Sequence, residues 1–261
     1  MKQIKISALV LAAASIASTG AMAQSSKTNA WEGADVAISV GYAQFMPKIG
    51  TGSTSPLTIP VLVAPPSTYV NTNVGSAVAS ASASNVNTGT ANISAGYNFG
   101  INSDYVLGIR AAYYPGASSS ASGSFAITAP GGGSPIPIPA GTPLGSPASV
   151  QYNVKNLYAI TLTPGYVIDK DRLAYLKVGY TGTSIGLNGP TLAYSTVNLS
   201  GYTLGLGYKQ MVSESIYLLG EFNYGGFSNK TATVTNTSGV AITAPFGGSG
   251  IDFLVGVGYR F

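Results

Sequence analysis

The chain has 261 residues and a formal net charge of +4, and only 8% of its residues are charged although 45% are hydrophobic. A soluble domain usually has about 25% charged residues, and the Lys and Arg residues are not clustered, so nucleic acid is not indicated as a partner. The absence of Cys and His excludes disulfides, metal sites built on thiolate or imidazole, and His-dependent catalysis. We therefore predict no catalytic residue, no metal, no cofactor and no enzymatic activity.

The N-terminal residues have the organisation of a targeting segment. Lys2 and Lys5 form a positive region before an apolar run, and Ala21-Met22-Ala23 provides a small-residue cleavage site. The run is too short to span a bilayer as a helix, which argues against the alternative of a retained anchor. We predict that residues 1–23 are a secretory signal peptide and that residues 24–261 form one domain.

The C-terminal segment alternates between two chemically different faces. Side chains on a strand point to opposite faces in turn, so Gly256, Gly258 and Arg260 share one face. The opposite face is wholly apolar and consists of Ile251, Phe253, Val255, Val257, Tyr259 and Phe261. About ten residues are enough for a tilted strand to cross a bilayer. The pattern predicts a membrane-spanning strand, with the edge strand of a soluble sheet as the alternative.

Seven further segments show the same alternation of apolar with small or polar residues, which is typical of barrel strands rather than helices. Together with the terminal segment, the predicted strands cover residues 34–46, 91–100, 104–115, 154–168, 172–184, 199–212, 215–227 and 251–261. The sequence therefore predicts an all-β fold with eight antiparallel strands. Pro164 lies inside one of them and removes a hydrogen-bond donor, so we expect a β-bulge there.

The connections between these strands are sorted by length. Tight turns lie at residues 101–104, 169–172 and 212–215, whereas the long connections cover residues 47–90, 116–153, 185–198 and 228–250. Short turns at one end and long loops at the other are the layout of outer-membrane barrels. The first two loops are rich in Pro, Gly and Ser and are expected to be mobile or partly polyproline. Residues 76–87 alternate weakly, which is compatible with an extension of the next strand.

Aromatic residues lie near both ends of the predicted strands, as expected where amphipathic rings meet lipid headgroups. Those near the short turns are Tyr97, Phe99, Tyr105, Tyr166, Tyr208, Tyr259 and Phe261. Those near the long loops are Tyr42, Tyr113, Tyr158, Tyr180, Tyr202, Tyr224 and Phe253. Tyr175 and Tyr217 are out of phase with this pattern.

Seven charged residues of the predicted strands fall on the inward face, as the cost of a charge facing lipid requires. They are Asp35, Arg110, Lys177, Lys209, Glu221, Asp252 and Arg260. A water-facing side of a soluble sheet explains this observation equally well. We predict a central ionic cluster with Glu221 between Arg110 and Lys177, because buried charges need partners. Asp35, Asp252 and Arg260 are expected nearer the rims, in contact with water.

The targeting segment, the alternating segments, the sorting of loops and the terminal Tyr259-Arg260-Phe261 together resemble the small eight-stranded bacterial outer-membrane β-barrels. That family includes the transmembrane domain of outer membrane protein A, outer membrane protein X and the opacity-type "porin family" proteins. The resemblance implies an up-and-down transmembrane barrel in the outer membrane of a Gram-negative cell, with short periplasmic turns and long extracellular loops. It also implies contact with outer-membrane lipid and insertion by the barrel-assembly machinery. The assembly signal would be Phe253, Val255, Val257, Tyr259 and Phe261.

Two functions remain open at this point. The first is a surface or structural role in adhesion or envelope integrity, with the chain acting as a monomer and an extracellular ligand bound at the long loops. The alternative is a narrow channel for ions or small solutes, gated by the cluster of Arg110, Lys177 and Glu221. A soluble secreted barrel is a third candidate.

Overall fold

The computed structural model describes residues 28–65, 67–117 and 121–261, so the predicted signal peptide at residues 1–23 lies outside the described residues. No helix in the described part of the chain is long and apolar enough to cross a membrane. The strands are β1 (Gly33–Ile49), β2 (Gly52–Ala64), β3 (Thr68–Ala83), β4 (Val86–Gly100), β5 (Tyr105–Ala117), β6 (Ala121–Thr128), β7 (Ala148–Asp169), β8 (Arg172–Gly189), β9 (Leu192–Met211), β10 (Ile216–Thr235) and β11 (Ala241–Arg260).

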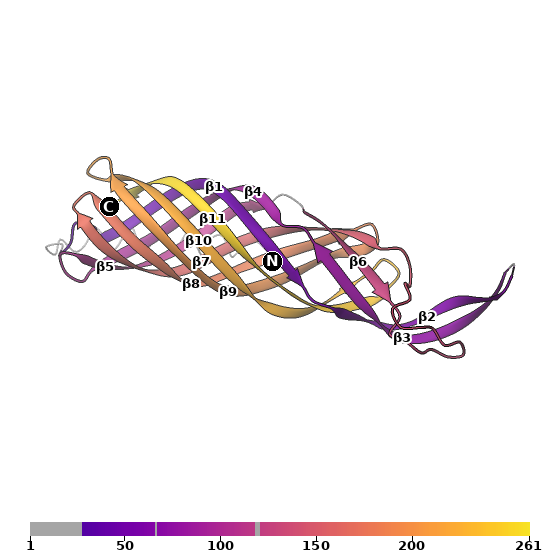
Figure 1. Ribbon diagram of the computed structural model, residues 1–261. Coiled ribbons are helices and arrows are strands. Elements are labelled where there is room, and N and C mark those ends of the chain that lie inside the picture. Colours follow the sequence, from indigo (N-terminus) through magenta and orange to yellow (C-terminus); the bar gives the residue numbers. More distant parts are fainter. Residues whose placement is uncertain (1–27, 66, 118–120) are drawn as a thin grey trace, which may run out of the picture.

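These strands form one antiparallel sheet that closes on itself (Figure 1). The hydrogen-bonded order runs β1–β4–β5–β7–β8–β9–β10–β11, and β11 pairs with β1 again. Consecutive members of this ring are neighbours, as in an up-and-down barrel. The all-β and antiparallel parts of the prediction are therefore confirmed. Closure matters because it leaves the ring without an open sheet edge.

The sheet contains eleven strands rather than the predicted eight, because three predicted strands each have a second strand as an extension. β2 continues β1, β3 precedes β4 and β6 follows β5. The register is unchanged across the first of these breaks, since Phe45 pairs with Val86 and Gly52 pairs with Ala79. At the long-loop end β2, β3 and β6 take the places of β1, β4 and β5, so that the order there is β11–β2–β3–β6–β7.

The prediction of long loops is therefore largely wrong. Much of residues 47–90 and 116–153 is strand, and β8 to β11 extend so far that only short connections join β8 to β9 and β10 to β11. The predicted strand ends were set by the thickness of a bilayer, but pairing with a long neighbour continues to satisfy backbone groups beyond that length. The β2–β3 hairpin projects furthest from the ring (Figure 1).

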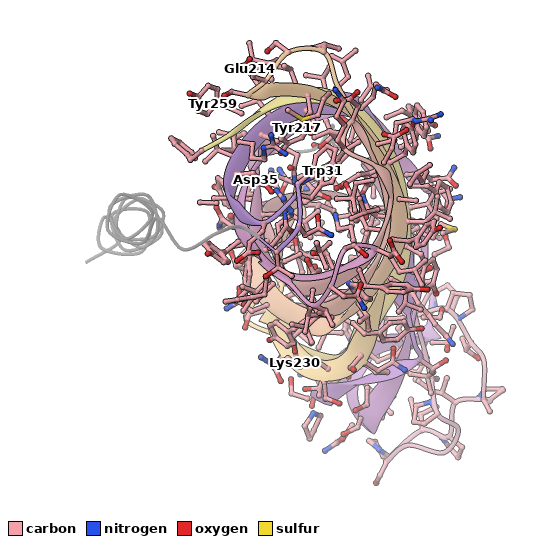
Figure 2. The ribbon with its side chains drawn as sticks, turned by 90° about the vertical axis from the view of Figure 1, so that its left-hand side faces the viewer. Trp31, Asp35, Glu214, Tyr217, Lys230 and Tyr259 are labelled. Carbon is pink, nitrogen blue, oxygen red and sulfur yellow. The ribbon has the colours of Figure 1, made fainter. Side chains whose placement is uncertain are left out.

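The two faces of the ring have opposite polarity. The neighbours Leu176 and Lys177 are 62% and 5% exposed, and this contrast recurs on every strand of the ring. Exposed apolar side chains on the outer face include Val36, Ile38, Val40, Ile93, Leu107, Ile109, Ile160, Leu162, Val178, Leu204, Leu206, Leu218, Val255 and Val257. Figure 2 looks along the ring from the short-turn end and shows Trp31 and Asp35 inside and Tyr259 outside. Polar groups therefore fill the interior, and apolar groups form a continuous outer belt.

Aromatic rings edge this belt at both ends. Tyr158 and Tyr180 lie 6.3 Å apart between ring centroids near the extended end, and Tyr202 and Tyr224 lie 6.1 Å apart at the same level. Near the short turns the corresponding neighbours are Tyr105 and Tyr166, at 5.5 Å. Such cross-strand pairs stabilise a sheet and match the two aromatic girdles that the sequence predicts.

The predicted β-bulge at Pro164 is wrong. Pro164 pairs in register with Leu107 of β5, and the pairing with β8 has the same register before and after it, with Leu162 opposite Val178 and Gly165 opposite Tyr175. The ladder to β8 is interrupted at Thr163 and Pro164. The missing N–H is thus accommodated by losing pairing on one side, without an inserted residue.

Beyond the belt, toward the extended ends of the strands, the interior changes from polar to apolar. The buried cluster there consists of Phe45, Ala79, Val86, Ala121, Tyr152, Ile185, Leu187, Leu192, Val197, Leu199, Val234, Ile242, Ala244 and Phe246. Tyr152 donates its hydroxyl hydrogen to the carbonyl of Ser84, and burial raises the pKa of Tyr152 to about 12. This cluster explains why the extensions of the strands are ordered: they enclose a hydrophobic core of their own.

Candidate functional site in the barrel interior

The group of charges nearest the short-turn end of the barrel surrounds Asp35 of β1, and we call it the lower cluster. Asp35 forms salt bridges with Arg110 and with Lys209, the latter at 3.0 Å from Nζ to Oδ2. The Tyr217 hydroxyl donates to the same carboxylate at 2.8 Å, and the Asn98 amide donates at 3.2 Å. Asp35, Arg110 and Lys209 are only 2–4% exposed. One buried carboxylate therefore balances two cations from β5 and β9.

A second group, the middle cluster, surrounds Glu221 of β10. Lys177 of β8 donates to Glu221 Oε2 at 2.7 Å, and the Tyr175 hydroxyl donates to Oε1. The amide nitrogen of Asn223 lies 3.4 Å from the same carboxylate. Its side chains come from β8 and β10, which lie on either side of β9 in the ring, so this cluster spans one neighbouring strand rather than the whole interior.

Asp252 of β11 lies next to the middle cluster, on the side toward the extended strands. It accepts a hydrogen bond from the Asn223 amide at 2.7 Å and one from the Tyr114 hydroxyl at 3.2 Å. Of the salt bridges among the described residues, none involves Asp252. Asp252 is thus a half-buried carboxylate with neutral hydrogen-bond donors but no cationic partner.

The structure brings Lys177 and Glu221 together, but it does not place Glu221 between Lys177 and Arg110. Arg110 is bound by Asp35 instead. Asp35 was expected near a rim and in contact with water, and this is wrong, because it is 2% exposed. The reason is that residues 28–32 cover the short-turn end. Arg260 does lie at that rim, where it donates to the carbonyls of Ala30 and Glu214.

Trp31 closes the short-turn end of the ring. It is 1% exposed, and its ring meets the edge of the Tyr217 ring at a centroid distance of 6.0 Å. The guanidinium of Arg260 lies 5.6 Å from the Trp31 ring, within the range of a cation–π interaction. The amide of Asn29 donates to the carbonyls of Asn102 and Ser103, which fixes the segment against a turn. No sequence pattern indicates this plug beyond the presence of the chain's one tryptophan.

Tyr175 and Tyr217 are the interior residues that the sequence reasoning missed. Both point inward and donate to the carboxylates of Glu221 and Asp35. Their phase, opposite to that of the belt tyrosines, was the signal that could have identified them. Among the described residues there is no group of three or more His, Cys, Asp or Glu side chains that could hold a metal ion.

We expect Tyr217→Phe to lower the free energy of unfolding by about 1.5–3 kcal/mol, the range for a hydrogen bond to a charged group. The ring stays in place, so the change removes only the donor to Asp35. Urea unfolding of the folded protein in lipid vesicles measures the effect. Tyr259→Phe is the matched control, because Tyr259 is 45% exposed on the outer face, and it should change stability by about 0.5 kcal/mol or less. Equal effects of the two substitutions would contradict the assignment of Tyr217.

The fold and interior described above define a class: a closed antiparallel β-barrel with polar groups inside and an apolar outer belt. No protein-family model matches the chain, and no curated protein matches it. Among solved structures, the chain is similar to the attachment invasion locus protein Ail of Yersinia pestis, at 13% identity over 87% of this chain and 98% of that one, with a TM-score of 0.40.

Two other similar structures are outer membrane proteins, the class that the sequence resembles. Outer membrane protein OprG of Pseudomonas aeruginosa is 12% identical over 88% of this chain and 97% of its own, with a TM-score of 0.44. The outer membrane protease OmpT of Escherichia coli is 11% identical over 87% and 96%, with a TM-score of 0.45. Similarities of this size carry neither a family nor an activity over to this chain.

The match to OmpT corrects one prediction. The chain was expected to have no enzymatic activity, yet a structure to which it is similar is that of a protease. The expectation that the chain is not an enzyme is withdrawn. A fold by itself assigns no activity.

Proposed function

We propose that this chain is an outer-membrane β-barrel whose eight-stranded ring, β1–β4–β5–β7–β8–β9–β10–β11, spans the lipid bilayer. The observation that carries the proposal is the reversed polarity of the ring, with charges buried inside and large apolar side chains exposed outside. In water such a belt would be an unusually large exposed apolar surface. In a bilayer it is the surface that lipid requires, and the closed ring pairs most of its backbone groups within the sheet.

The aromatic girdles and the C-terminal strand support an orientation with the short turns in the periplasm. Phe253, Val255, Val257, Tyr259 and Phe261 are 40–55% exposed on the outer face of β11 and at its end. This continuous apolar row is accessible to the barrel-assembly machinery, and we propose it as the assembly signal. The extended ends of the strands and the β2–β3 hairpin would then project from the cell surface.

For the function itself we favour a surface or structural role over a channel. Three tiers of side chains fill the interior, namely the plug at Trp31, the lower cluster and the middle cluster, and their charges are buried and paired. An eight-stranded ring has room for its own side chains and little more. The projecting hairpin offers exposed Leu62, Val63 and Tyr69 for contact with a partner in adhesion or envelope integrity.

We expect the refolded protein to give no steady single-channel conductance in a planar bilayer, because the paired charges and Trp31 leave no continuous water path. Protease protection of the belt strands must show in parallel that the protein is inserted. Steady openings that change in Glu221→Gln would instead support the narrow channel, since Glu221 binds Lys177 in the middle of the interior.

A further inference from the structure

The outer face of the barrel changes in character beyond the aromatic edge at the extended end. Polar side chains that face each other across neighbouring strands replace the apolar belt there. The hydroxyls of Ser82 and Ser124 lie 3.0 Å apart, and those of Thr233 and Thr243 lie 2.8 Å apart. An outer face of this composition suits a hydrated layer of hydrogen-bonding groups rather than hydrocarbon.

Charge is distributed unequally between the two ends of the barrel. Among the described residues, the charges on the strands beyond the aromatic edge are Lys48, Lys155 and Lys230. The chain has eight acidic residues, and all of them lie near the short turns or in the interior. They are Glu32, Asp35, Asp104, Asp169, Asp171, Glu214, Glu221 and Asp252. The surface of the extended end therefore carries cations and no acidic residue.

Lys155 of β7 is positioned on this surface by Tyr194 of β9. Its Nζ lies 5.5 Å from the centroid of the Tyr194 ring, within the range of a cation–π interaction, and 3.5 Å from the hydroxyl oxygen. The described residues include no salt bridge to Lys155. The ammonium group thus has a defined place on the outer wall but no acidic partner.

A glycine of β8 makes room for the Tyr194 ring. A Cβ atom on Gly186 would come within 3.3 Å of the Tyr194 hydroxyl oxygen and within 3.5 Å of a ring carbon. The Thr196 hydroxyl donates to the same hydroxyl oxygen at 3.4 Å. Tyr194 is nevertheless 62% exposed. The ring is therefore fixed on the wall with much of its surface free for contact.

Two polar side chains continue the row that begins at Lys155. Ser184 of β8 pairs in register with Lys155 on one side and with Asn198 of β9 on the other. Residues directly opposite each other on neighbouring strands share a face of the sheet, and the Ser184 hydroxyl donates to Oδ1 of Asn198 at 2.8 Å. A cation, an aromatic ring and polar groups thus meet on the outer wall of β7, β8 and β9, which run side by side (Figure 1). We call Lys155, Ser184, Tyr194 and Asn198 the wall site.

The wall site lies further from the belt than the headgroup of an ordinary phospholipid reaches. Ser184 follows the girdle residue Tyr180 by four residues on β8. With a rise of about 3.3 Å per residue and a strand tilt of about 40°, it lies about 10 Å beyond Tyr180 along the barrel axis. The headgroup layer of a phospholipid bilayer is about 5–8 Å thick on each side. A lipid that contacts the wall site therefore needs a larger headgroup.

We propose that the wall site binds the phosphorylated sugar headgroup of a membrane glycolipid in the leaflet around the extended end. The phosphate accepts hydrogen bonds from the Lys155 ammonium group, and the C–H face of the sugar lies on the Tyr194 ring. The sugar hydroxyls bond to Ser184 and Asn198. An anionic headgroup is favoured because the surface has cations and no acidic residue. The inference rests on the proposed membrane position of the barrel.

Native mass spectrometry of the full chain, released from detergent micelles with added lipid, tests the wall site. The probe is a diacylated glucosamine phosphate. Its two analogues are the same lipid without the phosphate and phosphatidic acid, which has the phosphate but no sugar. We expect the probe to bind about tenfold more tightly than either analogue, since each lacks one of the two contacts.

Substitutions assign each preference to a side chain. Lys155→Gln should remove the preference for the probe over the dephosphorylated lipid. Tyr194→Ala should remove the preference over phosphatidic acid, whereas Tyr194→Phe, which keeps the ring, should retain it. Lys48→Gln removes a cation at the same end and Lys170→Gln removes one at a short turn. Both controls should change the affinity by less than about twofold.

Three results would overturn the proposal. The first is a probe affinity no higher than that of the dephosphorylated lipid. The second is an equal loss of affinity in Lys48→Gln and Lys155→Gln, which would mean diffuse attraction of anions rather than a site. The third is binding of soluble N-acetylglucosamine phosphate as tightly as the lipid, which would exclude a glycolipid as the source. Failure of the membrane position itself would appear separately, as loss of protease protection of the belt strands.

Discussion

Asp35→Asn is expected to lower the free energy of unfolding by about 3–5 kcal/mol, the cost of breaking a buried ion pair by removing one partner. The substitution leaves Arg110 and Lys209 in the interior, 4% and 2% exposed, without the carboxylate that both of them contact. Asn is nearly the same size as Asp, so packing changes little. The effect therefore reports the two uncompensated charges.

Urea unfolding of the protein in lipid vesicles measures this effect. Asp171→Asn is the control, because this exposed carboxylate lies in a turn, and it should change stability by about 0.5 kcal/mol or less. Adding Lys209→Met to Asp35→Asn removes one orphaned charge and should recover part of the loss, as a double-mutant cycle would show. A loss below about 1 kcal/mol in Asp35→Asn would mean that water reaches the lower cluster.

Leu206→Arg is expected to cost about 2–4 kcal/mol if the outer face meets lipid, because Leu206 lies within the belt, between Tyr202 and Tyr208. Leu206 is 57% exposed, and in a soluble protein an exposed leucine can be replaced at little cost. Val212→Arg should cost about 0–1 kcal/mol. Val212 is also 57% exposed, but it lies at a short turn.

This pair of substitutions separates a membrane barrel from a soluble one. Both variants are refolded into lipid vesicles, and their free energies of unfolding are compared with that of the wild type. A clear difference between two equally exposed positions has no explanation in water. Small and equal costs at both positions would favour the soluble secreted barrel.

The sequence predicted which residues face the interior better than it predicted which of them meet. Alternation along a strand determines the face of a side chain, and it assigned Asp35, Arg110, Lys177 and Glu221 correctly to the inside. The position of each residue along the barrel axis depends on strand tilt and stagger. The alternation of side chains along a strand carries no information about either. For this reason Arg110 was assigned to Glu221 rather than to Asp35.

The ends of the strands were unpredictable for a different reason. Bilayer thickness gives the length that a strand needs to cross, but β8 to β11 continue until their apolar core above the belt is closed. The weak alternation of residues 76–87 did indicate an extension of the next strand, and most of these residues are strand, held by pairing with their neighbours rather than by strong local preference. The plug at Trp31 depends on contacts with turns distant in sequence, which no local pattern encodes.

The lower cluster also determines when the molecule can finish folding. Asp35 is bound by Lys209 and by Tyr217, which are 174 and 182 residues away along the chain. Contacts between such distant residues form slowly, since a long loop must close before they are made. Until β1 meets the C-terminal strands, Lys209 lacks its salt-bridge partner Asp35. A partly closed sheet would therefore contain an uncompensated ammonium group. Sealing of the barrel and neutralisation of its interior are therefore one cooperative event, which disfavours partly assembled forms.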